Sequence, residues 1–66
     1  MLKIEAVDLA LNSATQPMTV QEVTDAAAQT CGASVSKRHV QGIMNWELTK
    51  GTVRRDDTVS PYVYWR

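Results

Sequence analysis

Residues 34–57, SVSKRHVQGIMNWELTKGTVRRDD, contain the start and stop signals of one helix, followed by a change of hydrophobic period. Ser36 is a favourable N-cap, because a serine hydroxyl can accept a hydrogen bond from a free amide of the first turn. Gly51 can adopt the left-handed conformation that commonly ends a helix. The sequence therefore predicts a helix over residues 37–50, ended by this glycine.

The predicted helix has two unlike faces when its residues are placed at about 100° intervals. Val40, Ile43, Met44 and Leu48 form the apolar face, and Arg38, Gln41, Gly42, Asn45 and Thr49 form the polar one. Glu47 falls in angle between Val40 and Ile43, so it faces the core unless it reaches the edge or pairs with a basic neighbour. Trp46 lies off the centre of the apolar face and is expected to be partly covered. One face belongs to the core, and the other meets solvent or a ligand.

Two more helices are predicted before this one. Leu2, Ala6, Val7, Ala10 and Leu11 recur at helical spacing. They indicate an amphipathic helix over residues 2–13. Thr19 followed by Glu22 matches a capping box, in which the hydroxyl and the carboxylate each accept from the other residue's amide. A second helix is therefore expected over residues 20–30, with Gly32 as its C-terminal cap.

After the third helix, the spacing of hydrophobic residues changes from the helical period of about 3.6 residues to the strand period of two residues. Residues 52–55 and 62–65 alternate in this way, and the turn-forming residues 56–58 lie between them. This pattern predicts a two-stranded β-hairpin. Tyr64 and Trp65 point to opposite faces of their strand, so one closes the core and the other lies outside, and the pattern does not decide which. The expected fold class is α+β, mainly α, in a single domain of residues 1–66.

Composition limits the kinds of site that the chain can build. The apolar fraction of 44% is typical of a folded domain. One cysteine, Cys31, allows no internal disulfide, and one histidine, His39, adds too little for a zinc site. We therefore expect no metal and no cofactor. No apolar run approaches the roughly 18 residues of a membrane span, and no secretory pattern opens the chain, so we expect a cytoplasmic protein.

The charges are divided unequally along the chain although their formal sum is zero. Residues 1–33 have one basic side chain against four acidic ones, a net charge of −3, and residues 34–66 have six basic against three acidic, a net charge of +3. Such an asymmetry indicates a polyanionic partner. The zero total by itself argues against strong non-specific affinity for nucleic acid.

The whole pattern resembles a winged helix-turn-helix domain of the kind found in small bacterial and phage transcriptional regulators. Three segments carry the resemblance: Met18-Thr19-Val20-Gln21-Glu22-Val23, the third helix from Val35 to Leu48, and Lys50-Gly51-Thr52-Val53-Arg54-Arg55 leading to Tyr62-Val63-Tyr64-Trp65. In this family the third helix enters the DNA major groove, and the hairpin forms a wing that contacts the flanking backbone or minor groove. The resemblance implies a sequence-specific regulator of transcription whose partner is double-stranded DNA.

By position, the resemblance assigns roles to seven residues. Arg38, Gln41 and Asn45 become candidates for base contacts; Lys37, Lys50, Arg54 and Arg55 become candidates for the DNA backbone. Arginine can bond guanine as a fork, and glutamine or asparagine can bond adenine in the same way. Gly42 shares the polar face and costs roughly 1 kcal/mol relative to alanine inside a helix, which indicates close approach of a groove or of a packed neighbour. Adjacent strand residues face opposite ways, so only one of Arg54 and Arg55 can share the surface of the helix.

Other interpretations of the same residues remain open. The polar face of the third helix is also what any solvated helix would present, or it is a surface for another protein. Asp56 and Asp57 lie where turn formers are expected, and no nucleophile, base and orienting group can be assembled into an enzyme site. A domain this small covers little DNA, and Trp46 leans outward. A homodimer or a protein partner is therefore expected.

Overall fold

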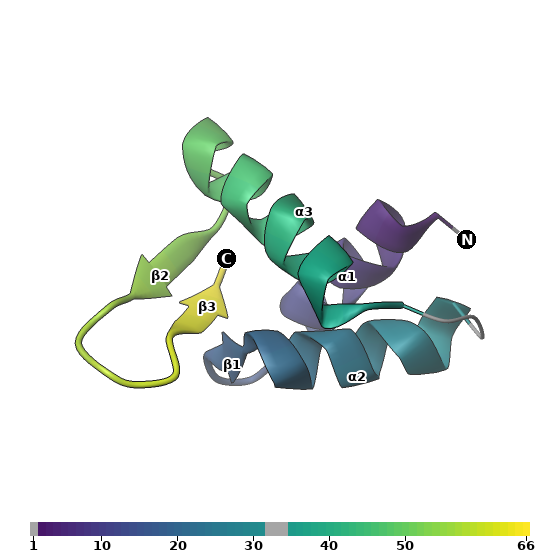
Figure 1. Cartoon of the computed structure of the whole chain (residues 1–66), viewed down its shortest axis with the longest axis horizontal. Helices are drawn as coiled ribbons and strands as arrows, with labels where there is room; N and C mark the ends of the chain where they lie inside the picture. Colours follow the sequence, from purple (N-terminus) through teal and green to yellow (C-terminus); the bar gives the residue numbers. More distant parts are fainter. Residues whose placement is uncertain (1, 32–34) are drawn as a thin grey trace.

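The structure is a computed structural model that describes residues 2–31 and 35–66 of the chain. Its elements are α1 (Lys3–Ser13), β1 (Met18–Thr19), α2 (Val20–Cys31), α3 (Lys37–Lys50), β2 (Arg54–Asp56) and β3 (Val63–Trp65). In Figure 1, α2 runs along the bottom, α3 rises diagonally away from it, α1 lies behind α3, and the hairpin of β2 and β3 extends at the end away from the N-terminus. The predicted α+β class with a mainly helical chain is confirmed.

The helix starts are fixed by the side chains that the sequence indicated. The Thr19 amide donates to Glu22 Oε1 at 2.9 Å, and the Glu22 amide donates to Thr19 Oγ1 at 3.2 Å. Ser36 Oγ accepts from the His39 amide at 3.0 Å. Both capping predictions are therefore confirmed, and the starts of α2 and α3 are each satisfied by local hydrogen bonds.

The end of α3 is a Schellman motif. The Gly51 amide donates to the Leu48 carbonyl at 3.1 Å, and the Thr52 amide donates to the Glu47 carbonyl at 3.0 Å. Gly51 has a φ of 83°, in the region where a side chain is strained, so the predicted glycine end is confirmed. The predicted cap at Gly32 lies outside the described residues.

The sheet has three strands and not the two that the sequence predicted. Its order is β1-β3-β2, and both pairings are antiparallel. The additional strand, β1, is Met18–Thr19, which pairs with Tyr64 and Val63. Two residues are too few to show the two-residue alternation of a strand, and their partners lie far away in the sequence. No local pattern could therefore predict this strand. The first strand of the hairpin also begins later in the sequence than predicted, at Arg54 instead of residue 52.

One apolar core joins all three helices to the sheet. Its buried members are Ala6, Val7, Ala10, Leu11, Val20, Val23, Ala27, Val40, Met44, Val53 and Tyr64. Tyr64 is 1% exposed, whereas Trp65 is half-buried, which decides the alternative that the sequence left open. The central strand therefore fills the space between the sheet and α3 with its tyrosine.

Candidate functional site

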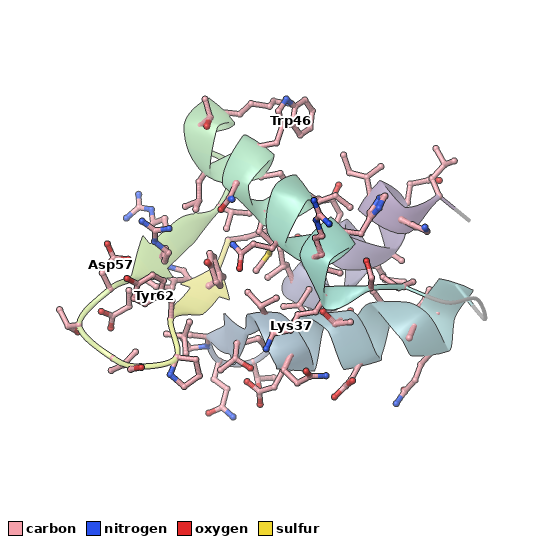
Figure 2. The ribbon with its side chains drawn as sticks, in the orientation of Figure 1. Lys37, Trp46, Asp57 and Tyr62 are labelled. Atoms are coloured by element: carbon pink, nitrogen blue, oxygen red, sulfur yellow. The ribbon has the colours of Figure 1, made fainter. Side chains whose placement is uncertain are left out.

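The outer face of α3 is exposed along its whole length. Lys37, Arg38, Gly42, Asn45, Thr49 and Lys50 are exposed, and Gln41 is half-buried. Figure 2 shows Lys37 at the start of α3 and Trp46 near its other end. No carboxylate among the described residues lies within ion-pair distance of the charged nitrogens of Lys37 or Arg38. The predicted base-contact helix therefore presents a cationic polar surface.

Gly42 lies in the middle of this surface, and no packing among the described residues requires a glycine there. Apart from its chain neighbours and the backbone of its own helix, no described heavy atom lies within 4 Å of the position that a Cβ at this site would occupy. The packed neighbour that the sequence left as an alternative is therefore not present within that range. A glycine there lowers helix stability by roughly 1 kcal/mol relative to alanine, and the missing side chain leaves open space beside the helix.

Gln41 and Asn45 are held together on the side of α3 that faces the hairpin. Gln41 Nε2 donates to Asn45 Oδ1 at 3.0 Å and to the Tyr64 hydroxyl at 3.2 Å. The buried tyrosine thus orients two of the three predicted base-contact residues. Both amides keep free polar groups, since Gln41 uses only its NH₂ in these bonds and Asn45 only its carbonyl oxygen.

A cleft separates α3 from the hairpin. It has a volume of about 400 Å³ and is lined by Thr19, Val20, Gln21, Lys37, Gln41, Ser60, Pro61, Tyr62 and Tyr64. The start of α2, the start of α3 and the hairpin therefore meet around one hollow. The tyrosines in it were missed as site residues, although the alternation of residues 62–65 was the signal that placed them on a strand.

The two arginines of β2 lie on opposite faces of the sheet, as expected. Arg55 pairs in register with Tyr64 and Arg54 with Trp65, so Arg55 shares the Tyr64 face. Arg55 Nε donates to Asp57 Oδ1 at 2.5 Å, and its guanidinium lies 5.0 Å from the centre of the Tyr62 ring. The hydrogen bond to Asp57 is the largest cause of a raised pKa of Arg55, and the hydrogen bond to Tyr64 is the second. Part of its charge is therefore already neutralised within the hairpin.

The remaining polar groups of the hairpin form a turn. Asp56 Oδ1 accepts from the Thr58 amide at 2.9 Å and from the Thr58 hydroxyl. Both hydrogen bonds lower the pKa of Asp56, and the one from the Thr58 hydroxyl contributes more than the one from the Thr58 amide. The interpretation of Asp56 as a turn former is confirmed, and Asp57 is the ion-pair partner of Arg55.

The far end of α3 is separate from the cleft. Lys50, predicted to contact the DNA backbone, places its Nζ 4.2 Å from the centre of the Trp46 ring. Trp46 is 51% exposed, so the expectation of partial covering is confirmed. Arg54 is exposed on the other face of the hairpin from Gln41. The structure thus groups Lys37, Gln41 and Asn45, and it places Lys50 and Arg54 at the margins.

A carboxyl pair lies on the opposite, buried side of α3. Glu47 is 4% exposed, as its angular position predicted, and burial, followed by hydrogen bonding and charge repulsion from Asp8, raises its pKa to about 7. Arg66 and Lys50 act in the opposite direction. Arg66 Nη1 lies 3.4 Å from Asp8 Oδ1. Neither Glu47 Oε2 nor Asp8 Oδ1 has a hydrogen-bond partner in the described part of the chain, so a proton on Glu47 can be shared with Asp8.

Residues 2–31 and 35–66 contain neither a membrane span nor a metal cluster. In these ranges no helix combines the length and apolar character needed to cross a membrane, and no three His, Cys, Asp or Glu side chains gather where they could hold a metal ion. Comparisons of the chain with protein-family models, with curated proteins and with solved structures found no match.

Proposed function

We propose that this chain is a small winged helix-turn-helix protein that binds double-stranded DNA and regulates transcription. In this proposal α2 and α3 form the helix-turn-helix, α3 lies in the major groove, and the hairpin of β2 and β3 is the wing. The order of elements supports it, because three helices precede a hairpin whose strand β3 also pairs with β1. The exposed cationic face of α3 beside that hairpin supports it further.

The observation that carries the proposal is the open surface at Gly42. Arg38 lies one turn before it and Asn45 one turn after it, so two side chains able to bond base edges flank a place where the helix backbone is bare. A helix with this arrangement can lie close to a groove floor while its longer side chains reach the bases. Because no atom of the described residues comes near the place of a side chain at Gly42, an external partner is the simplest reason for the glycine.

The proposed contacts fall into two groups with different chemistry. Arg38 can donate two hydrogen bonds to guanine, and Asn45, oriented through Gln41, can bond adenine. Lys37, Lys50 and Arg54 carry charges suited to phosphate contacts, which position a protein without reading sequence. Arg55 is expected to contribute less to backbone binding, because its guanidinium is bound to Asp57.

A second candidate function is binding of another protein through the outer face of α3. The exposed ring of Trp46 favours it, because exposed aromatic side chains often anchor protein partners. The zero formal charge of the chain favours it as well. The two functions differ in salt dependence, since only DNA binding releases counterions from a phosphate backbone.

Alanine variants separate base readout from backbone attraction. Arg38→Ala or Asn45→Ala is expected to lower affinity for a preferred duplex by roughly 1–3 kcal/mol and to reduce sequence preference. Arg54→Ala or Lys50→Ala is expected to weaken all duplexes about equally and to lower the magnitude of the salt slope by roughly one unit. Fluorescence anisotropy with selected and random duplexes at several salt concentrations measures both effects.

Lys3→Ala is the matched control, because it removes one exposed lysine from the start of α1. It is expected to change affinity less than Arg54→Ala does. If the parent binds no duplex in a salt-sensitive way, the proposal is wrong and the outer face of α3 belongs to a protein partner.

Gly42→Ala is expected to separate stability from binding. The new methyl group meets no described atom, and alanine favours the helix, so the free energy of unfolding should rise by up to about 1 kcal/mol. Affinity for duplex DNA should fall, because the methyl group keeps the helix away from the groove floor. Urea unfolding and anisotropy titration on the same sample test the prediction. Asn12→Ala, at an exposed position of α1, is the control, and unchanged DNA affinity in Gly42→Ala would remove the main support for the proposed docking of α3.

A further inference from the structure

Two apolar features of the surface, a projecting side chain and a groove, lie on different helices. One is the Trp46 side chain, which projects near the end of α3 and is 51% exposed. The other is a groove between α1 and α2, beside Leu9, which is 45% exposed. Single exposed apolar side chains are common, but a projecting aromatic side chain and an apolar groove are the two halves of an association contact.

Trp46 is accompanied by a positive charge. Lys50 Nζ lies 4.2 Å from the centre of the indole ring, so a cation covers one face of the aromatic side chain. The next cationic side chain on this side of α3 is Arg38, which lines a shallow hollow together with Gly42, Ile43 and Trp46. The projecting tryptophan is therefore an apolar knob with a basic border.

The groove between α1 and α2 has the opposite character. It has a volume of about 380 Å³ and is lined by Leu9, Ala10, Ser13, Ala14, Met18, Ala26, Gln29 and Thr30. Most of these side chains are small, which leaves a hollow of the size that one aromatic side chain can occupy. An adjoining hollow shares Ser13, Ala14 and Met18 and is lined by Glu22. One carboxylate, that of Glu22, therefore lies beside the groove.

The knob and the groove cannot meet within one molecule. In Figure 2, Trp46 projects at the top of the view, whereas α2, which forms one wall of the groove, runs along the bottom. The half of the chain that contains the groove has a net charge of −3, and the half that contains the knob has +3. A second copy of the chain therefore offers both the shape and the charge that each surface lacks.

We propose that this protein self-associates head to tail, with Trp46 of one copy inserted into the groove between α1 and α2 of the next. Lys50 accompanies the ring and approaches Glu22 at the edge of the groove. A two-fold contact of Trp46 on Trp46 would instead bring Lys50 of one copy toward Lys50 of the other, and like charges in contact are unfavourable. The contact is small, so the association is weak, with a Kd on the order of 0.1–1 mM.

A head-to-tail contact leaves one knob and one groove free at the ends of every assembly, so growth does not stop at a dimer. Sedimentation equilibrium without DNA, from about 10 μM to about 2 mM protein, should show a mean mass that rises from the 7.3 kDa of the monomer past that of a dimer. Because DNA is absent, the result does not depend on the proposed function. A mass that stays at that of the monomer at the highest concentration overturns the proposal.

Two variants with complementary defects identify the contact. Trp46→Ala removes the knob and keeps the groove, and Leu9→Lys blocks the groove and keeps the knob. Each is expected to remain monomeric alone, whereas an equimolar mixture should form a one-to-one dimer and no larger species. Both positions are exposed, so folding is expected to persist, and circular dichroism checks it. Lys50→Glu is a second test of the knob and should weaken association in the parent background.

Val59→Ala is the matched control, since it removes an exposed apolar side chain from the hairpin and should associate as the parent does. Undiminished association of Leu9→Lys alone would show that the groove is not used. Continued monomeric behaviour of the mixture, under conditions in which the parent associates, would equally overturn the head-to-tail contact.

Discussion

Replacing Tyr64 with alanine is expected to lower the free energy of unfolding by about 3–5 kcal/mol. Tyr64 is 1% exposed and is the largest fully buried side chain of the described core. It also lies on the central strand β3, where Met18 and Arg55 are its partners on the two sides. A domain of this size has a total stability of roughly 3–10 kcal/mol, so the variant should be largely unfolded at room temperature or close to it.

Urea denaturation followed by circular dichroism measures this loss, and Tyr64→Phe is its matched control. The phenylalanine keeps the ring in the core and removes only the hydroxyl that accepts from Gln41 Nε2, so its cost should be about 1 kcal/mol. A similar cost for both variants would show that the hydrogen bond, and not the packing of the ring, is the important contribution. A cost below about 1 kcal/mol for Tyr64→Ala would contradict the position of the ring in the core.

Replacing Glu47 with glutamine is expected to stabilise the protein above neutral pH by about 3 kcal/mol. The pKa of Glu47 is raised from 4.5 to about 7, so the folded state retains a proton that the unfolded state loses. The contribution of this group to stability is therefore greatest below pH 4.5, falls as the pH rises toward 7, and is constant above it. Glutamine has a similar shape to the protonated carboxyl and does not titrate, so the difference between variant and parent follows this curve.

The measurement is the free energy of unfolding of parent and variant by urea at pH values from about 4 to about 8.5. Subtracting the free energy of unfolding of the parent from that of the variant cancels the contributions of the carboxyl groups that both proteins share. Asp25→Asn is the control, because it makes the same change from carboxylate to amide at an exposed position outside the core. A constant difference between Glu47→Gln and the parent across the range would mean that Glu47 titrates normally. Asp8, Arg66 and Lys50 are the other charged groups that act on this carboxyl.

The parts of the fold that could be predicted are those encoded by neighbouring residues. Thr19 with Glu22, Ser36 with the start of α3, and Gly51 with its end each act within one helical turn. Residues close in sequence were enough to place them. The burial of Glu47 was also predictable, because it follows from angles within a single helix.

The features that could not be predicted depend on residues far apart in sequence. Strand β1 is defined by its pairing with β3 and has no period of its own. The choice between Tyr64 and Trp65 depends on which face of the strand meets α3. The bond from Gln41 to Tyr64 spans 23 residues, and the approach of Asp8 to Glu47 requires α1 and α3 to pack.

The candidate site shows the same division. The side-chain chemistry of α3 indicated a polar face able to bind a ligand, and the structure places Arg38, Gln41 and Asn45 there. Whether Gly42 had a packed neighbour was a question of space, which only the folded chain answers. The function of this face remains a proposal for the binding experiments.

The strand order β1-β3-β2 has a consequence for the kinetics of folding. The last strand in the sequence is the middle strand of the sheet, and it pairs with residues 44 to 46 positions earlier, as Thr19 with Val63 and Met18 with Tyr64. The helices need only local contacts and can form in microseconds or less. Closing β1 on β3 needs most of the chain to be ordered first, because the entropy of a long loop is lost before the pairing is gained. We therefore expect the rate of folding to be limited by this closure and to respond to mutations in the strand pairing more than to mutations in the helix caps.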